Sequence, residues 1–574
     1  MVAYRVEVED ARAHLFRVTL TLPRPAAQQV LALPAWIPGS YMVRDFARHL
    51  SHLEARQGRR PVPLEQRDKT TWVAHCSGTA ALVLSYRVYA FDSSVRGAFL
   101  DAERGFFNGS SLFLRAAGRD AEPQRLALGT LPRGWQVATA MAGDGPRRFV
   151  AADYAELIDH PFTLGRCWRG TFTAGGVPHE MVVTGAWPSF DGDRLLADTR
   201  RLCAAQIRFW HGRGKPPFDR YVFHLHVSDG GSGGLEHRAS TALGATRAEL
   251  PRRGESTASD ATVGLLGLVS HEYFHTWNVK RLRPRDMEPP DLAREHHSTL
   301  LWFFEGFTSY YDDLFLLRAG LVDRGQYLRL LARPIQTVLG TPGRHAQSVA
   351  EASFDAWTRY YRQDENTPNA TVSYYAKGAL VALLCDLWLR THAGQTLDTL
   401  MQRLWQRSRG GPIGEDDILT TAAALGGAGL RTALQGWVHG RGELPLAAAL
   451  APLGVVLREE APSLAATLGL KLAEGALSGV QVRQVLRGGA AEAAGLSPGD
   501  ELLAVDGWRL RRLDDARQWL RPGAAFDLLM ARDQRVATLR VVPPARPLAP
   551  AVTLAADDTA APAALALRRA WLGG

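Results

Sequence analysis

The spacing of hydrophobic residues changes twice along this 574-residue chain, and the change limits the folds that it can adopt. Up to about residue 255, apolar and polar residues alternate in short runs such as YRVEVE and ALVLSYRVYAF, which is the pattern of half-buried strands. Between about 260 and 450 apolar residues recur at helical spacing, and strand patterns resume after about 460. Strands and helices are segregated, so we expect a multidomain α+β protein.

The length supports several domains, because a single hydrophobic core rarely organises more than about 300 residues. Hydrophobic residues make up 46% of the sequence, enough to fill more than one core. In the tail, a short helix from about 561 to 572 is expected to dock through Trp571. The predicted parts are an all-β N-terminal domain (1–160), the β part (161–255) and helical part (256–450) of a central domain, a C-terminal β domain (460–545) and a tail (546–574).

The charge pattern argues against a nucleic-acid-binding protein, although the net charge is +9. Lysine and arginine are scattered among acidic residues, and no run of five or more like charges occurs. The apolar, uncharged run at residues 444–457 is too short to cross a bilayer and contains two prolines. We therefore expect neither nucleic acid nor a membrane as a partner.

The cysteines and the first residues favour a cytoplasmic location. Cys76, Cys167, Cys203 and Cys385 lie far apart without a CxxC pair, which argues against a disulfide framework and a cysteine zinc site. The opening residues MVAYRVEVEDARAH place acids where a signal peptide requires an apolar stretch.

Residues 270–281 read SHEYFHTWNVKR and raise the possibility of a metal site. On a helix, His271 and His275 share one face and can present imidazole nitrogens to one ion. Glu272 is rotated by about 100° from the first histidine, near enough to reach a metal-bound water without becoming a ligand. The preceding LLGLV predicts a buried helix, where polar groups need a partner. The alternative is two histidines on an ordinary helix.

A zinc hydrolase usually needs a third protein ligand and one open position. The best candidate is Glu305, which stands among aromatic residues in LWFFEGFTSYY. A buried, unpaired carboxylate is unfavourable, so it requires a cation. A nearby arginine is the alternative partner for this carboxylate, and the pair His296-His297 is a competing source of a ligand.

These residues resemble the gluzincin metallopeptidases, in which a helix with HExxH is followed by one that carries a glutamate ligand in an EG context. The wider pattern is similar to the glycyl aminopeptidase family, and the interval between His275 and Glu305 is longer than in alanyl-type aminopeptidases, as in the glycyl family. A WIPGSY turn at 36–41 also matches, and we interpret it as structural. The other matching segments are GGLEHRAST (233–241), HEYFHTWNVKRLRP (271–284), LWFFEGFTSYY (301–311) and SYYAKG (373–378).

The resemblance implies a thermolysin-like catalytic domain with one zinc ion per chain, held by His271, His275 and Glu305. Zinc would lower the pKa of its water towards about 7 and polarise the scissile carbonyl. Glu272 would take a proton from that water and pass it to the leaving amine.

The resemblance also assigns residues that would contact the substrate. Tyr375 of the YxKG segment would donate a hydrogen bond to the oxyanion, with its neighbour Tyr374 as a rival and two core tyrosines as the alternative. Glu236 in GGLEH, with Gly234 beside it, would bind the substrate's free α-ammonium and so enforce cleavage at the chain end. A solvated loop glutamate after the glycine run is the alternative. Alanyl-type enzymes carry GAMEN where this sequence has GGLEH. His237 either supports the site from behind Glu236 or is a surface histidine, and we favour the surface position.

The C-terminal β domain resembles a PDZ domain in AAEAAGLSPGD followed by the strand ELLAVDG. Leu468, Gly469 and Leu470 match the loop whose N–H groups capture a peptide's C-terminal carboxylate, and the following strand would accept the peptide by β-augmentation. Residues 514–522 are expected to form the helix on the other side of the groove.

These features and the resemblance favour a zinc aminopeptidase, and the resemblance implies that it releases glycine, then alanine, from peptides with a free N-terminus. Peptide C-termini are possible partners at the PDZ groove. One alternative is an endopeptidase of the same fold, in which Glu236 would have no role. The other is an inactive, PDZ-based peptide-binding adaptor.

Overall fold

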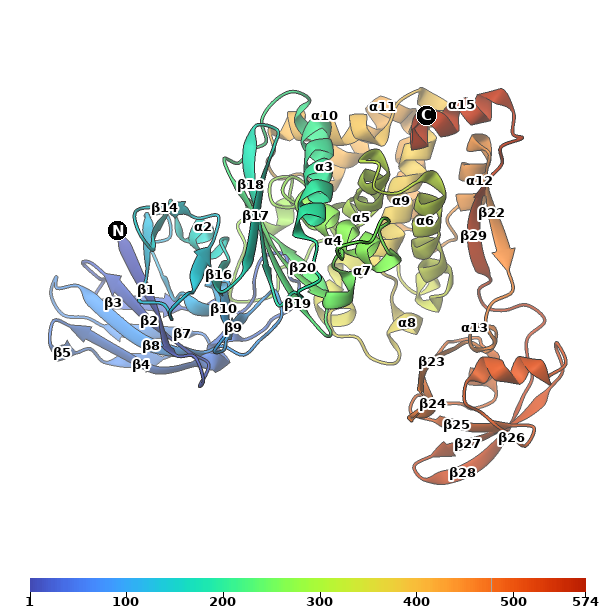
Figure 1. Ribbon diagram of the computed structural model, residues 1–574, viewed down its shortest axis with the longest axis horizontal. Helices are drawn as coiled ribbons and strands as arrows, with labels where there is room; N and C mark the ends of the chain where they lie inside the picture. Colours follow the sequence, from blue (N-terminus) through green and yellow to red (C-terminus); the bar gives the residue numbers. More distant parts are fainter. Residues whose placement is uncertain (476, 574) are drawn as a thin grey trace. The chain divides into compact units, whose positions relative to one another are not determined.

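The computed structural model describes residues 1–475 and 477–573 and contains two compact units. The first comprises Met1–Arg283, Met287–His296 and Gly410–Pro412, and strands dominate it (Figure 1). The second comprises Pro284–Asp286, His297–Arg409 and Ile413–Gly574, and holds a helical region followed by strands. The predicted α+β segregation is confirmed, whereas the domain boundaries stay a prediction.

Three sheets form the N-terminal part of the first unit. In the largest, strands alternate buried and exposed residues as the sequence pattern requires, and their buried residues join one core. Its order is β14 (Ala142–Gly143), β15 (Arg148–Ala151), β12 (Gln124–Leu128), β1 (Val2–Asp10), β2 (Leu15–Leu22), β8 (Leu82–Tyr89), β4 (Leu50–Gln57) and β5 (Arg60–Pro61). The other two are β13 (Gln136–Ala138), β16 (Phe162–Gly165), β10 (Arg104–Phe107), β9 (Ala98–Leu100), and β11 (Arg115–Ala116), β3 (Gln28–Ala32), β7 (Thr71–His75), β6 (Leu64–Gln66).

A five-stranded mixed sheet follows in the first unit. Its order is β17 (Trp168–Ala174), β18 (Val177–Thr184), β19 (Tyr221–Ser228), β21 (Ser240–Thr246) and β20 (Gly233–Glu236). Strands β18, β19 and β21 are parallel, while β20 lies antiparallel at the edge. Helix α3 (Gly192–His211) contacts β17, and α4 (Asp260–Phe274) contacts α3, β20 and β21. The edge strand and α4 are therefore neighbours.

The second unit begins with helices that pack around α5 and α9. These two cross at glycines, because a Cβ added to Gly306 would lie 2.4 Å from the Cα of Gly378. None of the described helices is long and apolar enough to span a membrane. The α-helices between residues 301 and 450 are α5 (Leu301–Arg318), α6 (Arg324–Leu339), α7 (Val349–Phe354), α8 (Thr367–Ala370), α9 (Tyr374–Trp388), α10 (Leu397–Ser408), α11 (Glu415–His439) and α12 (Leu446–Leu450).

The C-terminal β domain has its own apolar core. Residues 514–522, expected as a helix, form only a 3-10 helix over Leu513–Gln518, and the proline and glycine at 522–523 fit this early end. The domain holds α13 (Leu464–Leu468), β23 (Leu470–Gly475), β24 (Gly479–Val485), α14 (Ala490–Ala493), β25 (Glu501–Val505), β26 (Trp508–Arg509), β27 (Phe526–Arg532) and β28 (Arg535–Val541). A separate ribbon pairs β22 (Val455–Glu460) with β29 (Ala551–Ala556).

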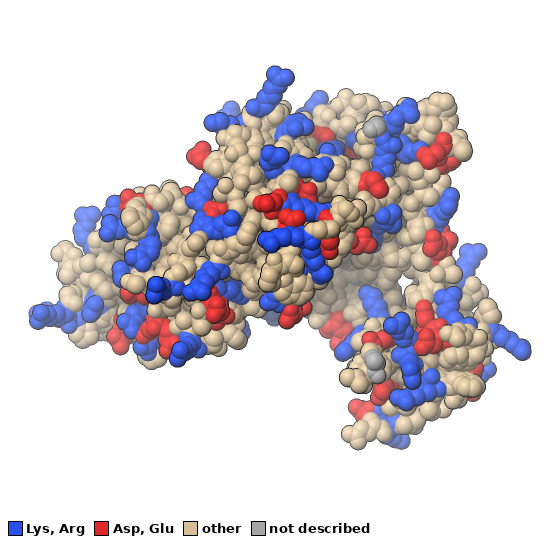
Figure 2. Space-filling view, viewed as in Figure 1, with Lys and Arg blue, Asp and Glu red and all other residues tan. Residues whose placement is uncertain are grey.

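Basic and acidic residues are interleaved on the face of the molecule shown in Figure 2. No single-sign band covers that face, which agrees with the scattered charges of the sequence.

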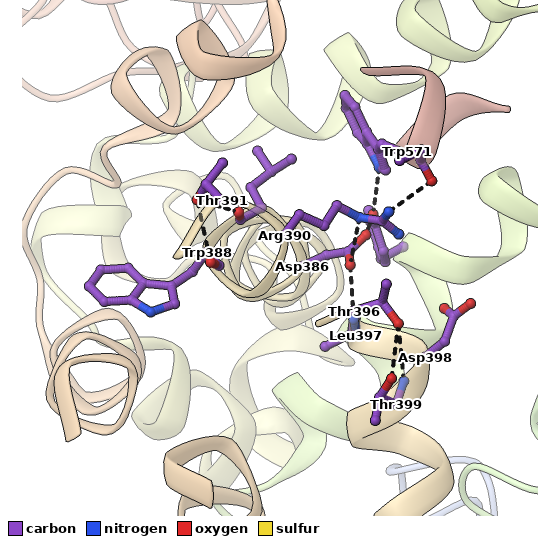
Figure 3. Close-up of polar contacts among 12 residues, drawn as sticks. Asp386, Trp388, Arg390, Thr391, Thr396, Leu397, Asp398, Thr399 and Trp571 are labelled. Carbon is purple, nitrogen blue, oxygen red and sulfur yellow. Dashed lines mark hydrogen bonds and ion pairs between the residues drawn. The ribbon is translucent and has the colours of Figure 1, made fainter. Parts of the chain in front are cut away.

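The predicted C-terminal helix is confirmed as α15 (Pro562–Leu572), and it docks through Trp571 (Figure 3). The Trp571 indole donates to the hydroxyl of Tyr310 at 3.0 Å, and that hydroxyl donates to the buried Asp386 carboxylate at 2.7 Å. Arg390 pairs with the same carboxylate at 3.0 Å and donates to the carbonyl oxygen of Ala570 at 2.9 Å. The helix is thus fastened to α5 and α9 by a buried polar network.

Replacing Trp571, which is 3% exposed, by alanine is expected to lower the free energy of unfolding of the helical region by about 3–5 kcal/mol. The change opens a cavity and removes the donor to Tyr310. Urea unfolding followed by circular dichroism would measure it. Trp508→Ala is the control, because that side chain is 67% exposed and should change stability by less than about 0.5 kcal/mol. Equal unfolding midpoints for the two variants would contradict the docking role.

Candidate metal centre

Two histidines lie one turn apart at the C-terminal end of α4. The helix begins after Ser259, whose hydroxyl accepts from the backbone N–H of Thr262 at 3.1 Å. The Nε2 atoms of His271 and His275 are 3.0 Å apart. The Nδ1 atom of His275 lies 2.7 Å from the carbonyl oxygen of Asn278, which can only accept. Nδ1 therefore carries the proton, and Nε2 presents its lone pair towards His271.

A buried carboxylate completes a set of metal ligands. Glu305 on α5 is 2% exposed. One ligand atom each from His271, His275 and Glu305 lies within 4.8 Å of the others, and residues 1–475 and 477–573 contain no second cluster of this kind. Two imidazole nitrogens and one carboxylate oxygen match a catalytic zinc site with an open position. The rival pair His296-His297 is not part of the cluster.

The Glu272 carboxylate packs against the edge strand β20. A Cβ added to Gly234 would lie 2.0 Å from Oε1 of Glu272, so the carboxylate fills the space that a side chain at this position would take. Because β20 is an edge strand, one side of its backbone pairs with no other strand of the described residues. An acid or base thus lies beside an edge to which an extended peptide can add.

The second carboxylate on this edge strand belongs to Glu236, which is 4% exposed. Its Oε1 atom has no hydrogen-bond partner among the described residues. Burying an unsatisfied anionic oxygen is unfavourable, and an ammonium group is the kind of ligand that would satisfy it. The alternative of a solvated loop glutamate is inconsistent with this burial.

The residue after Glu236 is also buried, and the expected surface position of His237 is wrong. Its Nδ1 atom lies 3.2 Å from Asp159, which also accepts from Lys280 at 2.7 Å and from the backbone N–H of Arg238 at 2.9 Å. Burial alone would raise the pKa of Asp159, but Lys280 and His237 lower it overall. The sequence carried no signal for Asp159, because its partner lies 78 positions away.

Two tyrosines begin α9, and only one of them is accessible. Tyr374 is fully buried, whereas Tyr375 is partly exposed and its hydroxyl lies 3.2 Å from that of Tyr361. Removal from water and the nearby Glu305 carboxylate raise the pKa of Tyr375 well above its usual value. Its phenol therefore keeps its proton and can donate a hydrogen bond.

Two family models match separate parts of the chain, the N-terminal β region and the region that holds the candidate metal ligands. A family model described as the Peptidase M61 N-terminal domain matches residues 3–166, and one described as M61 glycyl aminopeptidase matches 264–381. An aminopeptidase N family protein of solved structure from Idiomarina loihiensis is 34% identical, with a TM-score of 0.94 and 100% of each chain covered. The chain belongs to the M61 glycyl aminopeptidase family. This M61 protein is a metallopeptidase of the aminopeptidase class.

Other comparisons are weaker. An M1 zinc metallopeptidase from Deinococcus radiodurans is 17% identical, with a TM-score of 0.47, and the match covers 78% of this chain and 94% of that one. No curated protein matches the chain.

A PDZ domain model matches residues 481–532 of the M61 protein, which confirms the C-terminal module. Leu468 and Leu470 are buried, and Gly469 between them ends α13 in the left-handed conformation before β23 begins. The carbonyl oxygen of Gly469 accepts from the backbone N–H of Leu486 at 2.8 Å. Peptide binding at this loop stays a prediction.

Replacing Gly234 by alanine is expected to lower kcat/KM by about 100-fold or more, because the new Cβ would displace the Glu272 carboxylate from beside β20. Hydrolysis of alanyl p-nitroanilide would measure it. Gly230→Ala is the matched control in the same glycine-rich segment, since a Cβ there would have no neighbour within 4 Å. Full activity of the Gly234→Ala variant would show that catalysis does not require the Glu272 carboxylate to lie beside β20.

Proposed function

We propose that the protein is a zinc-dependent aminopeptidase that releases glycine first and alanine next from peptides with a free N-terminus. The buried Oε1 atom of Glu236 carries the proposal, because it has no hydrogen-bond partner among the described residues and lies on the same edge strand as Gly234, which packs against Glu272. One carboxylate is thus available for an ammonium group, and a second one beside the same strand is available as a base.

The metal part of the proposal assigns His271, His275 and Glu305 as ligands. The facing Nε2 atoms, the proton held on Nδ1 of His275 and the buried Glu305 carboxylate support this set. A zinc ion bound there would supply a Lewis acid that activates water and polarises the scissile carbonyl.

The proton transfers are assigned to Glu272. As general base it would accept a proton from the attacking water, and as general acid it would donate that proton to the leaving amine. Tyr375 would donate a hydrogen bond to the carbonyl oxygen as negative charge develops there. Its raised pKa supports this role, and its exposure favours it over the buried Tyr374.

The substrate would lie along β20 with its first residue at Glu236. Charge-assisted pairing with that carboxylate would fix the distance from the free N-terminus to the reacting bond. An endopeptidase substrate brings no charge to this position, so the buried carboxylate disfavours that alternative. The adaptor alternative does not explain why His271, His275 and Glu305 lie together as a set of metal ligands.

Three further expectations belong to the proposal. The chain would divide at 1–160, 161–255, 256–450, 460–545 and 546–574, and the PDZ groove would bind peptide C-termini at Leu468, Gly469 and Leu470. The protein would act in the cytoplasm, which the four free cysteines support.

The decisive experiment pairs metal analysis with substrate blocking. We expect about one zinc per chain, loss of glycyl p-nitroanilide hydrolysis on chelation and recovery with zinc. Acetylation of the substrate's amino group should abolish hydrolysis, because it removes the charge that Glu236 would bind. Cleavage of acetylated peptides would favour an endopeptidase. Absence of both metal and turnover would favour the adaptor.

Glu236→Gln keeps the shape of the side chain and removes its charge. We expect KM for glycyl substrates to rise by about 10- to 100-fold with a smaller change in kcat, since a hydrogen bond to a charged group contributes about 1.5–3 kcal/mol. Steady-state kinetics would separate the two parameters. Glu103→Gln removes an exposed glutamate and serves as the control. Unchanged kinetics would remove Glu236 from the site.

A further inference from the structure

The WIPGSY turn, which the sequence suggested to be structural, lies directly against Glu236. Gly39 has a φ of +98°, and a Cβ added to it would lie 2.5 Å from Oε1 and 2.7 Å from Cδ and Oε2 of Glu236. Non-bonded atoms do not approach so closely. The backbone of residue 39 therefore occupies the space next to the carboxylate, and any side chain there would have to displace it.

The turn is anchored and cannot easily yield. The Trp36 indole donates to the carbonyl oxygen of Asp291 at 2.8 Å. The backbone N–H of Ala35 donates to the carbonyl oxygen of Leu292 at 2.7 Å. Arg44 donates to the hydroxyl of the buried Ser40 at 2.9 Å. The start of the turn is thus held by residues 291 and 292, and Arg44 braces Ser40 within the same segment, so a clash at residue 39 would be relieved by movement of the Glu236 side chain.

Glu236 is restrained from the opposite direction as well. It ends β20, and the next two residues are held by Asp159 through the His237 ring and the backbone N–H of Arg238. The backbone that carries the carboxylate is therefore fixed, and the torsions of the Glu236 side chain are the remaining freedom. Because Gly39 has no side chain, the Glu236 side chain can adopt the conformation in which its carboxylate lies against the turn.

We infer that Gly39 is a positioning residue for Glu236, which fixes the carboxylate where it can bind the substrate's α-ammonium. The inference rests on the proposed function of Glu236. It assigns part of the aminopeptidase site to the N-terminal β domain. A side chain at position 39 would turn the carboxylate away from the free N-terminus and leave Glu272 and the metal ligands in place.

Gly39→Ala is the kinetic test. We expect KM for glycyl p-nitroanilide to rise at least 10-fold, kcat to stay within about twofold and the zinc content to be unchanged. Adding Gly39→Ala to Glu236→Gln should raise KM little further, because both changes remove the same interaction. Gly118→Ala controls for strain, since Gly118 has a φ of +79° and a Cβ there would have no neighbour within 4 Å.

A stability measurement tests the contact without relying on catalysis. The thermal midpoint of Gly39→Ala should fall further than that of Gly118→Ala, and Glu236→Ala in the same chain should restore the difference by removing the clashing carboxylate. If this restoration occurs while Glu236→Gln leaves KM unchanged, the contact stands and the proposed role of Glu236 fails. If Gly39→Ala leaves KM unchanged, or its effects simply add to those of the Glu236 variants, the inference is overturned.

Discussion

The site depends on buried carboxylates, two of which lie where only glycine leaves room for them. Glu272 occupies the space above Gly234 and Glu236 lies against Gly39, while Glu305 is buried on α5. Removing a carboxylate from water is unfavourable by several kcal/mol unless a cation or donor compensates for it. The Oε1 atom of Glu236, which has no hydrogen-bond partner among the described residues, is prepared for a ligand that carries positive charge.

This burial couples stability to ligand binding. A ligand that binds the folded chain alone stabilises it in proportion to the logarithm of its concentration. Glu305 and the two α4 histidines would gain such stabilisation from a metal ion, and Glu236 would gain it from an ammonium group. Some buried acids are paired within the protein, as Glu180 is with Arg169 and Arg220, and Asp386 is with Arg390 and Tyr310.

The sequence was most informative where the signal is local. HExxH predicts two ligands because helical spacing fixes their common face, and Glu305 stands out as one acid among aromatic residues. The C-terminal helix was also expected from its own short segment, and Trp571 within it was expected as the docking residue. Contacts between distant segments gave no such signal, so the turn at Gly39 was interpreted only as structural and His237 was placed at the surface. The 3-10 helix at Leu513–Gln518 shows the same limit, since its length depends on its tertiary surroundings.

The proposed discrimination between free and blocked N-termini would follow from the same electrostatics. A pocket that merely fits a small residue separates substrates by about 10- to 200-fold, because one methylene changes binding little. A site with a buried group that needs a specific partner can reject substrates that lack the partner by about 10⁴-fold, since the group is then left unsatisfied. Oε1 of Glu236 is such a group. Its burial therefore favours selection for a charged chain end over selection by side-chain size, and any glycine preference would be added to that by the walls around the first residue.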